Sequence, residues 1–342
     1  MSRIAVVLFN LGGPDSRDTV EPFLVNLFSD SAIIALPNPL RWLIARLIAR
    51  RRAPIAREIY ARIGNASPIL ANTEMQARAL ERVLGEGYRC FVAMRYWHPM
   101  SDAAARAVAA WQPDEVVLLP LYPQFSSTTT ASSLAAWQQE VERIGLAVPT
   151  RAVCCHPEDG MVAAIAAKIR TALAEWPAGV KLRILLSAHG LPLRTVARGD
   201  PYQWQIERTA AAIRARLGAG VAEAIVCYQS RVGPLKWLEP ATDAEIRRAG
   251  ADGTGLIVAP IAFVSEHSET LVELDMEYRH LAERSGVPRY VRVPTVDDDP
   301  AFIAGLAEVV RAARTGSAIA PAGGRRICPD GFALCPCGES GR

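Results

Sequence analysis

The feature that most constrains the fold of this chain is an internal repeat. Three apolar segments of the first half recur, in the same order, in the second half. Each has the length of a buried strand and runs into a turn rich in Gly, Pro or polar residues. The first-half segments are residues 3–14, 88–99 and 116–128, and their counterparts are residues 182–192, 222–234 and 257–278.

Segments with helical periodicity separate these strands, at residues 70–84, 101–111, 131–144, 161–175, 203–217 and 240–250. Strands that alternate with helices are typical of parallel, doubly wound sheets. We therefore expect an α/β fold of two similar Rossmann-like domains, residues 1–150 and 151–312, each a parallel sheet flanked by helices. An active cleft is expected between them. Residues 313–342 form a Cys-rich extension.

Composition narrows the class of protein. A chain of 342 residues, half of them hydrophobic, can bury two cores. Its net charge of only +3 does not indicate a nucleic-acid partner. We see no signal peptide and no apolar run of bilayer length, which predicts a cytoplasmic protein. Seven cysteines in such a protein indicate thiols or metal ligands rather than disulfides.

The most distinctive segment, residues 264–278, follows an apolar run at residues 255–263. Helical spacing there predicts two stripes, an acidic one of Glu269, Glu273 and Glu277 and an apolar one of Leu271, Leu274 and Tyr278. An acidic stripe is ordinarily a solvated helix face. The carboxyl end of a parallel strand, however, would deliver His267 and Glu269 into a cleft, which favours a functional role.

A second amphipathic segment, residues 40–52, is basic. Its apolar positions Leu40, Leu43, Ile44, Leu47 and Ile48 have helical spacing, and its cations are Arg46, Arg50, Arg51 and Arg52. The ordinary interpretation is a helix that faces the core. The functional interpretation is a helix that rests on an anionic membrane surface or lines a hydrophobic entrance to the substrate cleft. Contact with a membrane surface predicts peripheral membrane association.

Four segments in order resemble the signature segments of the ferrochelatase family, the enzymes that insert ferrous iron into protoporphyrin IX to make haem. They are residues 10–14 (NLGGP), 187–192 (SAHGLP), 229–234 (QSRVGP) with Trp237, and 265–271 (SEHSETL). The resemblance extends from residue 4 to about residue 312. It implies a cleft for protoporphyrin IX, with His189 and Glu269 on opposite sides of the macrocycle near its centre.

The chemistry of metallation accounts for these residue types. Two pyrrole nitrogens must lose protons, and an imidazole such as that of His189 can accept one, or briefly ligate Fe²⁺, at cytosolic pH. Glu269, Glu273 and Glu277, with His267, could carry metal inward or protons outward, because carboxylate oxygens exchange Fe²⁺ readily. The sequence leaves that direction open.

Bending the macrocycle towards the product requires tight walls, for which Leu11, Tyr122 and Trp237 are the candidates. The propionates of the substrate require cations or hydroxyl donors. We assign these to Arg95 and Tyr96, with Ser126 as a helper. Arg95 has the alternative role of a structural ion-pair partner. The expected partners are protoporphyrin IX and Fe²⁺, and the chain is expected to be a monomer or homodimer.

The Cys-rich extension predicts a metal centre, because a segment with so little apolar material needs something besides packing to order it. Cys328, Cys335 and Cys337 supply three thiolates, and a fourth ligand must come from the body of the protein. We choose Cys154, with Cys155 as the fallback. The resemblance favours a [2Fe-2S] cluster, as several ferrochelatase lineages carry one here, and structural zinc is the alternative. One family pattern takes a ligand at the position of Ser127.

Three alternatives to a protoporphyrin ferrochelatase remain at this point. A coproporphyrin ferrochelatase would require a more polar entrance to the cleft than residues 37–52 provide. A cobalt chelatase that acts on a soluble tetrapyrrole would be expected to lack that hydrophobic segment. A non-catalytic haem-binding or iron-sensing protein could keep the same fold and use the cysteines as its sensor.

Overall fold

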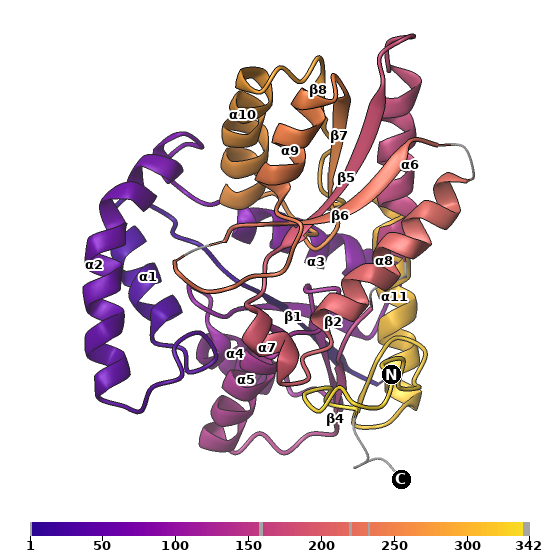
Figure 1. Cartoon of the computed structure of the whole chain (residues 1–342). Coiled ribbons are helices and arrows are strands. Elements are labelled where there is room, and N and C mark those ends of the chain that lie inside the picture. Colours follow the sequence, from indigo (N-terminus) through magenta and orange to yellow (C-terminus); the bar gives the residue numbers. More distant parts are fainter. Residues whose placement is uncertain (1, 157–159, 219–220, 232, 338–342) are drawn as a thin grey trace. The chain divides into compact units, whose positions relative to one another are not determined.

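The computed structural model describes residues 2–156, 160–218, 221–231 and 233–337. Val232 of the predicted turn and residues 338–342 of the predicted extension lie outside the described residues. The chain divides into two compact units (Figure 1). The first consists of Met1–Cys155, Ala307–Arg326 and Pro336–Arg342, and the second of His156–Leu306 and Ile327–Cys335. The predicted extension is thus shared by both units.

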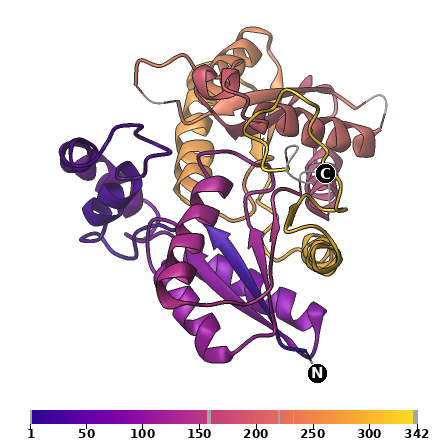
Figure 2. The same cartoon turned by 90° about the horizontal axis from the view of Figure 1, so that it is seen from below.

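The first unit is built on a parallel sheet of order β2-β1-β3-β4-β9. Its strands are β1 (Ile4–Asn10), β2 (Tyr88–Met94), β3 (Glu115–Pro120), β4 (Thr150–Val153) and β9 (Ile319–Ala320). The helices α3 (Ile69–Leu84), α4 (Ser101–Trp111) and α5 (Thr130–Ile144) cover its faces (Figure 2). Every residue of β1 is buried, which explains its continuous apolar sequence.

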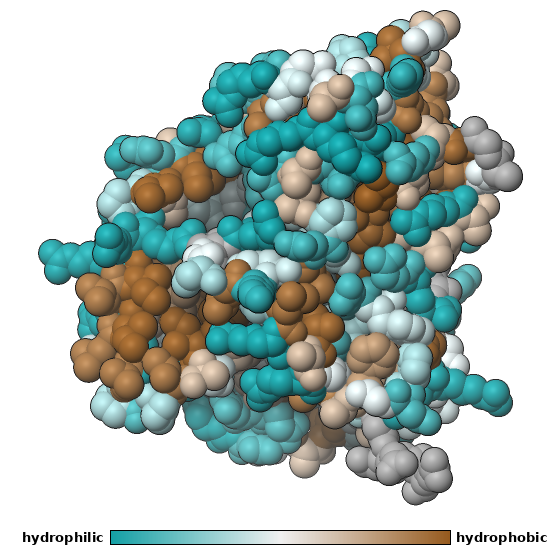
Figure 3. All heavy atoms as spheres, in the orientation of Figure 1, coloured by the Kyte–Doolittle hydropathy of each residue, from teal (hydrophilic) through white to brown (hydrophobic). Residues whose placement is uncertain are grey.

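Two further helices of this unit, α1 (Val20–Phe28) and α2 (Leu40–Ala61), pack on each other apart from the sheet (Figure 2). The buried face of α2 is made of Ala45, Ala49 and Ala53. Leu40, Leu43 and Leu47 of the predicted apolar stripe are instead exposed, as is Ile55 of the same helix. Figure 3 shows an apolar patch over α2. The interpretation of that stripe as core-facing is therefore wrong.

The second unit contains a parallel sheet of order β6-β5-β7-β8. Its strands are β5 (Leu182–His189), β6 (Glu223–Gln229), β7 (Gly255–Pro260) and β8 (Tyr290–Arg292). Its helices are α6 (Gly160–Ala174), α7 (Leu193–Ala197), α8 (Tyr202–Leu217), α9 (Thr242–Ala251) and α10 (Tyr278–Arg284), and α11 (Pro300–Thr315) runs from this unit into the first.

The two sheets share one topology. In each, the first strand of the unit lies in the middle, the second on one side, and the third and fourth on the other. The predicted repeat and the predicted fold class, two Rossmann-like parallel sheets flanked by helices, are therefore confirmed. The cleft between them stays a prediction. None of the described helices is both long enough and apolar enough to cross a membrane.

The acidic helix differs from the expected α-helix. Residues Glu269–Glu277 form a π-helix, η1, in which the Tyr278 N–H donates to the carbonyl oxygen of Glu273, five residues earlier. The changed spacing buries Thr270, Val272 and Leu274. The predicted apolar stripe is correct for Leu274, which lies in the core cluster of this unit, whereas Leu271 is only half-buried.

Candidate active site

His189 is the last residue of β5, and its neighbours fix its backbone. The Gly190 N–H donates to the Gln229 carbonyl oxygen at 2.8 Å. The Tyr202 hydroxyl donates to the His189 carbonyl oxygen at 3.0 Å. A Cβ atom at residue 190 would lie 2.9 Å from that same Gln229 oxygen, so this close approach requires glycine. The strand end is therefore rigid where the imidazole leaves it.

The surroundings of the ring select its tautomer. Nδ1 lies 2.6 Å from the carbonyl oxygen of Gly190, an acceptor, so Nδ1 carries the hydrogen of the neutral ring. The lone pair is then on Nε2, which lies 3.6 Å from Oε2 of Glu269. With 39% of its side chain exposed, His189 presents a basic nitrogen to solvent beside a carboxylate.

This geometry bears on one expectation. A flat macrocycle held between two side chains separates them by about 7 Å, two carbon–carbon contact distances. Nε2 of His189 and Oε2 of Glu269 are only 3.6 Å apart. This conformation leaves no room for a macrocycle between the two side chains, and their placement on opposite sides of it stays a prediction.

Ser230, which the sequence analysis did not single out, joins two of the acidic residues. Its hydroxyl lies 3.2 Å from Oε2 of Glu269 and 2.5 Å from Oε2 of Glu273. Its backbone N–H donates to Oε1 of Glu273 at 2.9 Å. Ser230 has a φ of 60°, an uncommon conformation for a residue other than glycine. The signal in the sequence was its position, directly after β6 in a turn that follows Gln229.

Glu273 is half-buried. It also accepts hydrogen bonds from Nε2 of Gln229 at 3.1 Å and from the Tyr278 hydroxyl at 2.9 Å. Burial raises the pKa of Glu273 above its ordinary value, and the charge of Glu269 raises it further, although the bonds from Ser230 and Tyr278 oppose this. Glu273 is thus suited to take up a proton near Glu269.

A pocket of about 600 Å³ lies beside the π-helix, wholly within the second unit. Its charged lining consists of Arg231, Arg247, Arg284, Asp243, Glu273 and Glu277, and its apolar lining includes Leu235, Trp237, Tyr278 and Leu281. The indole of Trp237 packs close to Gly190, 3.2 Å from where a Cβ atom there would be. The predicted wall residue is therefore adjacent to His189.

His267 does not belong to the acidic line. It is buried, its ring lies 4.7 Å from that of Phe263, and its Nδ1 is 3.0 Å from the Ser265 carbonyl oxygen. Phe263 in turn lies 6.5 Å from the ring of His189. These contacts are those of a packing residue, and the part of His267 in the proton or metal path stays a prediction.

In the first unit, Arg95 and Tyr96 both bind Asp30. Nη2 of Arg95 lies 2.8 Å from Oδ2 of Asp30, and the Tyr96 hydroxyl donates to the same oxygen at 2.8 Å. Ser132 hydrogen-bonds to both Asp30 and Arg95. Burial alone would raise the pKa of Asp30, but the bond from Ser132 and the charge of Arg95 hold it below its ordinary value. The structural ion pair is therefore the observed arrangement.

The other predicted contacts of the first unit vary in exposure. Tyr96 and Ser126 are buried, and the hydroxyl of Ser126 lies 2.9 Å from that of Thr128. The assignment of these two hydroxyls to the propionates stays a prediction. Leu11 and Tyr122 are half-buried and pack against the α1–α2 core and the sheet core, respectively. Each keeps an exposed edge that a wall residue needs.

Three cysteines of the first unit, Cys154, Cys155 and Cys337, gather beside the added strand β9. The Cys154 N–H donates to the Ala320 carbonyl oxygen at 2.8 Å. Sγ of Cys154 lies 3.4 Å from Sγ of Cys337 and 3.6 Å from Sγ of Cys155. Neighbouring residues of a strand point to opposite faces, but β4 ends at Val153, so the sulfur atoms of Cys154 and Cys155 can lie close together.

The remaining cysteines are distributed over both units. Cys328 and Cys335 are buried in the second, where Cys328 lies 3.2 Å from Nε2 of Gln205. No disulfide joins any of the seven cysteines, all of which are described. Within residues 2–156, 160–218, 221–231 and 233–337, no three His, Cys, Asp or Glu side chains are grouped so that they could hold a metal ion.

Known proteins resemble this chain over nearly its full length. A sequence model of the family Ferrochelatase matches residues 3–314. A ferrochelatase of Caulobacter vibrioides (strain NA1000 / CB15N) is 51% identical over 344 residues, covering 98% of each chain. One of Phenylobacterium zucineum (strain HLK1) is 50% identical, covering 99% of each.

The fold has counterparts among solved structures. SirB from Bacillus subtilis with Fe3+ matches with a TM-score of 0.51 and 12% identity, covering 92% of this chain and 96% of that chain. At that identity the match shows the fold alone. The sequence comparisons confirm the predicted family and the predicted enzyme class, a lyase. The chain belongs to the ferrochelatase family, the enzymes that insert iron into protoporphyrin at the terminal step of haem biosynthesis.

Proposed function

We propose that this chain inserts Fe²⁺ into protoporphyrin IX with His189 as the acceptor of pyrrole protons. The observation that carries this proposal is the orientation of the imidazole. Its Nδ1 hydrogen is bound to the Gly190 carbonyl, so the basic Nε2 is free to face a substrate. Glu269, 3.6 Å from Nε2, stabilises the imidazolium that forms.

Insertion breaks two pyrrole N–H bonds and forms four iron–nitrogen bonds with no change of oxidation state, so two protons must leave. His189 takes each of these protons in turn from a pyrrole nitrogen and passes it to Glu269. The Ser230 hydroxyl, within hydrogen-bonding distance of Glu269 and Glu273, supports onward transfer to Glu273. The raised pKa of Glu273 makes it a suitable next acceptor. Fe²⁺ approaches the same nitrogen, and His189 and Glu269 are its proposed transient ligands.

The charges that line the pocket favour the transfer of protons, rather than of metal ions, along the acidic stripe. Glu273 and Glu277 reach a pocket that Arg231, Arg247 and Arg284 also line. Three guanidinium groups offset the three carboxylates of the lining, so the pocket does not attract a dication over the surrounding solvent. We therefore assign Glu273 and Glu277 to the outward path of protons.

The macrocycle requires walls and anchors. We assign the walls to Trp237, Leu11 and Tyr122, the first supported by its contact with Gly190. Arg95 keeps 20% of its side chain exposed while it binds Asp30, so a propionate can approach the guanidinium from the solvent side. Tyr96 supports this cation from within: the ring lies 4.9 Å from the guanidinium carbon.

The test of the proposed function is direct. Purified protein is mixed anaerobically with Fe²⁺ and protoporphyrin IX, and loss of porphyrin fluorescence is followed together with the appearance of haem absorption. We expect turnover with protoporphyrin and slower turnover with coproporphyrin. Binding of haem without turnover would contradict the proposal and favour the sensor, and faster turnover of coproporphyrin would reassign the substrate.

Glu269→Gln should weaken insertion without unfolding the protein. The amide keeps the size of the side chain but loses the charge that stabilises the imidazolium. We expect kcat to fall about 10- to 100-fold, because a neighbouring charge typically stabilises the protonated form of an imidazole by about one to two pKa units. Steady-state kinetics with both substrates measure this. Glu283→Gln, at an exposed position of α10, is the control and should retain full activity. Unchanged kcat in Glu269→Gln would remove Glu269 from the mechanism.

We propose in addition that Cys154, Cys328, Cys335 and Cys337 hold a [2Fe-2S] cluster. Two thiolates on one tetrahedral metal lie about 3.8 Å apart, given metal–sulfur bonds of ~2.3 Å. The separations of 3.4 Å for Cys154–Cys337 and 3.6 Å for Cys154–Cys155 are compatible with that chemistry. Four thiolates suit zinc equally well. When bound, the group would supply structural cross-links or a response to iron and redox state.

The α2 patch is proposed to rest on the membrane. Its exposed Leu40, Leu43 and Leu47 lie with Trp42, over whose ring Arg46 stacks at 4.5 Å. Apolar side chains beside cations suit the headgroup boundary of an anionic bilayer. The proposed localisation is cytoplasmic, with peripheral association at a membrane surface.

We expect the protein to float with anionic vesicles at low salt and to detach as salt rises, since each surface Arg contributes about 1 kcal/mol. Leu43→Glu with Leu47→Glu should abolish flotation, because it removes apolar contact and adds repulsion. Leu193→Glu, at an exposed leucine of α7, is the matched control and should float normally. Failure of the unaltered protein to float at low salt would exclude the proposal.

A further inference from the structure

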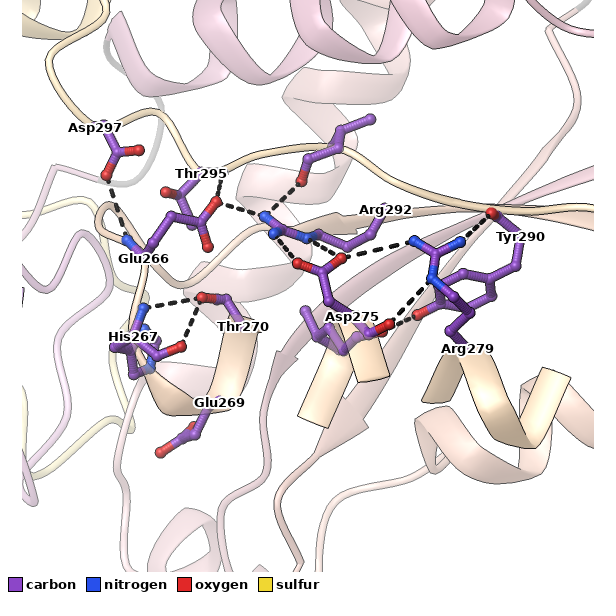
Figure 4. A network of polar contacts seen from close by, with 12 residues as sticks. Glu266, His267, Glu269, Thr270, Asp275, Arg279, Tyr290, Arg292, Thr295 and Asp297 are labelled. Atoms are coloured by element: carbon purple, nitrogen blue, oxygen red, sulfur yellow. Dashed lines mark hydrogen bonds and ion pairs between the residues drawn. The ribbon is translucent and has the colours of Figure 1, made fainter. Parts of the chain in front are cut away.

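Arg292, the last residue of β8, binds two carboxylates on either side of the site segment. Its Nη1 lies 2.5 Å from Oε1 of Glu266. Its Nε lies 3.0 Å from Oδ1 of Asp275, and its Nη2 binds the other oxygen of the same carboxylate. Only 7% of the Arg292 side chain is exposed. Figure 4 shows the guanidinium between the two acids. The bidentate contact with Asp275 gives this pairing a fixed geometry.

The segment between these two anchors contains Glu269. The chain leaves the sheet after Pro260, passes Glu266 and Glu269, and reaches Asp275 inside η1. Arg292 binds both Glu266 and Asp275 and so connects the two ends of this segment. Glu266 is held further by the Thr295 N–H, which donates to its Oε1 at 2.9 Å. In Figure 4 the Glu269 side chain extends away from this network. The network therefore contacts the supporting side of the segment and leaves Glu269 available to His189.

The same face supplies partners for the carbonyl groups of the π-helix. Where five-residue hydrogen bonding returns to the four-residue spacing of α10, carbonyl acceptors outnumber the N–H donors. The Tyr290 hydroxyl donates to the Leu274 carbonyl oxygen at 2.7 Å. Nε of Arg279 donates to the Asp275 carbonyl oxygen at 3.1 Å, and its Nη1 binds the Tyr290 carbonyl oxygen at 3.0 Å. The Tyr290 hydroxyl thus supplies a partner for the Leu274 carbonyl group, and Arg279 adds a bond to the Asp275 carbonyl group.

We propose that Arg292 and Tyr290 are positioning residues that hold residues 269–277 in the π-helical register. If the segment relaxed to an α-helix, the rotation per residue about the helix axis would change. The resulting shift in side-chain direction would add up over the residues from Asp275 back to Glu269. Glu269 would then leave Nε2 of His189, and Glu273 would leave Ser230. Neither Arg292 nor Tyr290 touches the reacting atoms, so both act through the glutamates.

The inference rests on the proposed function only for its kinetic readout. Tyr290→Phe removes one hydroxyl, and Arg292→Lys keeps a cation but cannot bridge two carboxylates. We expect kcat for iron insertion to fall about 10- to 100-fold, the effect of a displacement near 1 Å, while KM for porphyrin changes less than about twofold. Hydrogen exchange of the amides in residues 270–278 should accelerate in both variants, whether or not iron is supplied.

Arg183→Lys is the matched control. Arg183 also bridges two acids, Glu223 and Asp252, both at 2.8 Å, and 9% of its side chain is exposed. It lies near the start of β5, whereas His189 ends that strand. Arg183→Lys and Arg292→Lys should both lower thermal stability, because each loses a bridge between two carboxylates. Arg183→Lys, however, should leave kcat and the hydrogen exchange of residues 270–278 unchanged.

The outcomes separate the two proposals. If the unaltered protein inserts iron but Arg292→Lys and Tyr290→Phe keep its kcat and exchange rates, the positioning role is wrong and the proposed function stands. If the unaltered protein inserts no iron, the proposed function fails, and hydrogen exchange alone still decides the role of Arg292. Should Arg292→Lys not fold, Tyr290→Phe decides it, because the loss of one hydroxyl leaves the ring in the core.

Discussion

Replacement of His189 by alanine is expected to lower kcat for iron insertion about 10²- to 10⁴-fold, the usual contribution of a positioned acid–base group. The methyl group of alanine cannot accept a pyrrole proton, and Glu269, with no imidazole at 3.6 Å, has no basic neighbour to receive one from. The measurement is the rate of porphyrin fluorescence loss at saturating Fe²⁺ and protoporphyrin, with porphyrin binding followed separately by fluorescence quenching.

His280→Ala is the control for this experiment. His280 lies on α10 of the same unit, 62% of its side chain is exposed, and its neighbour Glu283 is at 3.7 Å. Its removal should leave kcat unchanged. A His189→Ala protein that is folded, binds porphyrin and inserts iron at a near-normal rate would refute the role of His189 as proton acceptor. Partial recovery with added imidazole would support that role directly.

Cys335→Ser is expected to remove the metal centre completely. Protein purified anaerobically should be reddish and contain two irons and two sulfides per chain, the content of a [2Fe-2S] cluster. A serine hydroxyl is a poor substitute for a thiolate, so the variant should lose colour, iron and sulfide together. Because binding to the folded state contributes to stability, its thermal midpoint should fall as well. Absorption spectra and metal analysis provide the readout.

Cys90→Ser is the matched control, since Cys90 lies in β2 and is not among the proposed ligands. It should keep the colour and the metal. Stoichiometric zinc in a colourless unaltered protein would overturn the cluster and keep the ligand set. Cys155→Ser tests the remaining ambiguity, because Sγ of Cys155 is 3.6 Å from that of Cys154. Loss of metal there would make Cys155 the fourth ligand.

The sheets could be predicted because their determinants are local in the sequence. Strands such as β1 and β7 are buried along their whole length, so each is a continuous apolar run closed by a turn. Repetition of the order then defined the topology. By contrast, β9 has two residues, Ile319 and Ala320, and becomes a strand only because β4 offers a free edge. No local pattern contains that information.

The active site was only partly predictable for the same reason. The sequence identified His189 and Glu269 through their places after strands, but their separation depends on the π-helix. The side-chain partners of that helix include Tyr290 and Arg292, which lie on β8, further along the chain. In α2, helical spacing identified one apolar face correctly. It could not show that the buried face is a different one, made of alanines. Packing partners far along the chain decide such cases.

The discontinuity of the first unit has a consequence for biosynthesis. Its sheet ends in β9, which pairs with β4 from 167 residues earlier in the chain (Ala152 with Ile319). During translation, β1 to β4 leave the ribosome first, yet their edge strand emerges only after the whole of β5 to β8. The second sheet can therefore close while the first still has an open edge. An open edge attracts other strands, so the nascent chain passes through a period in which pairing with other molecules competes with its own completion.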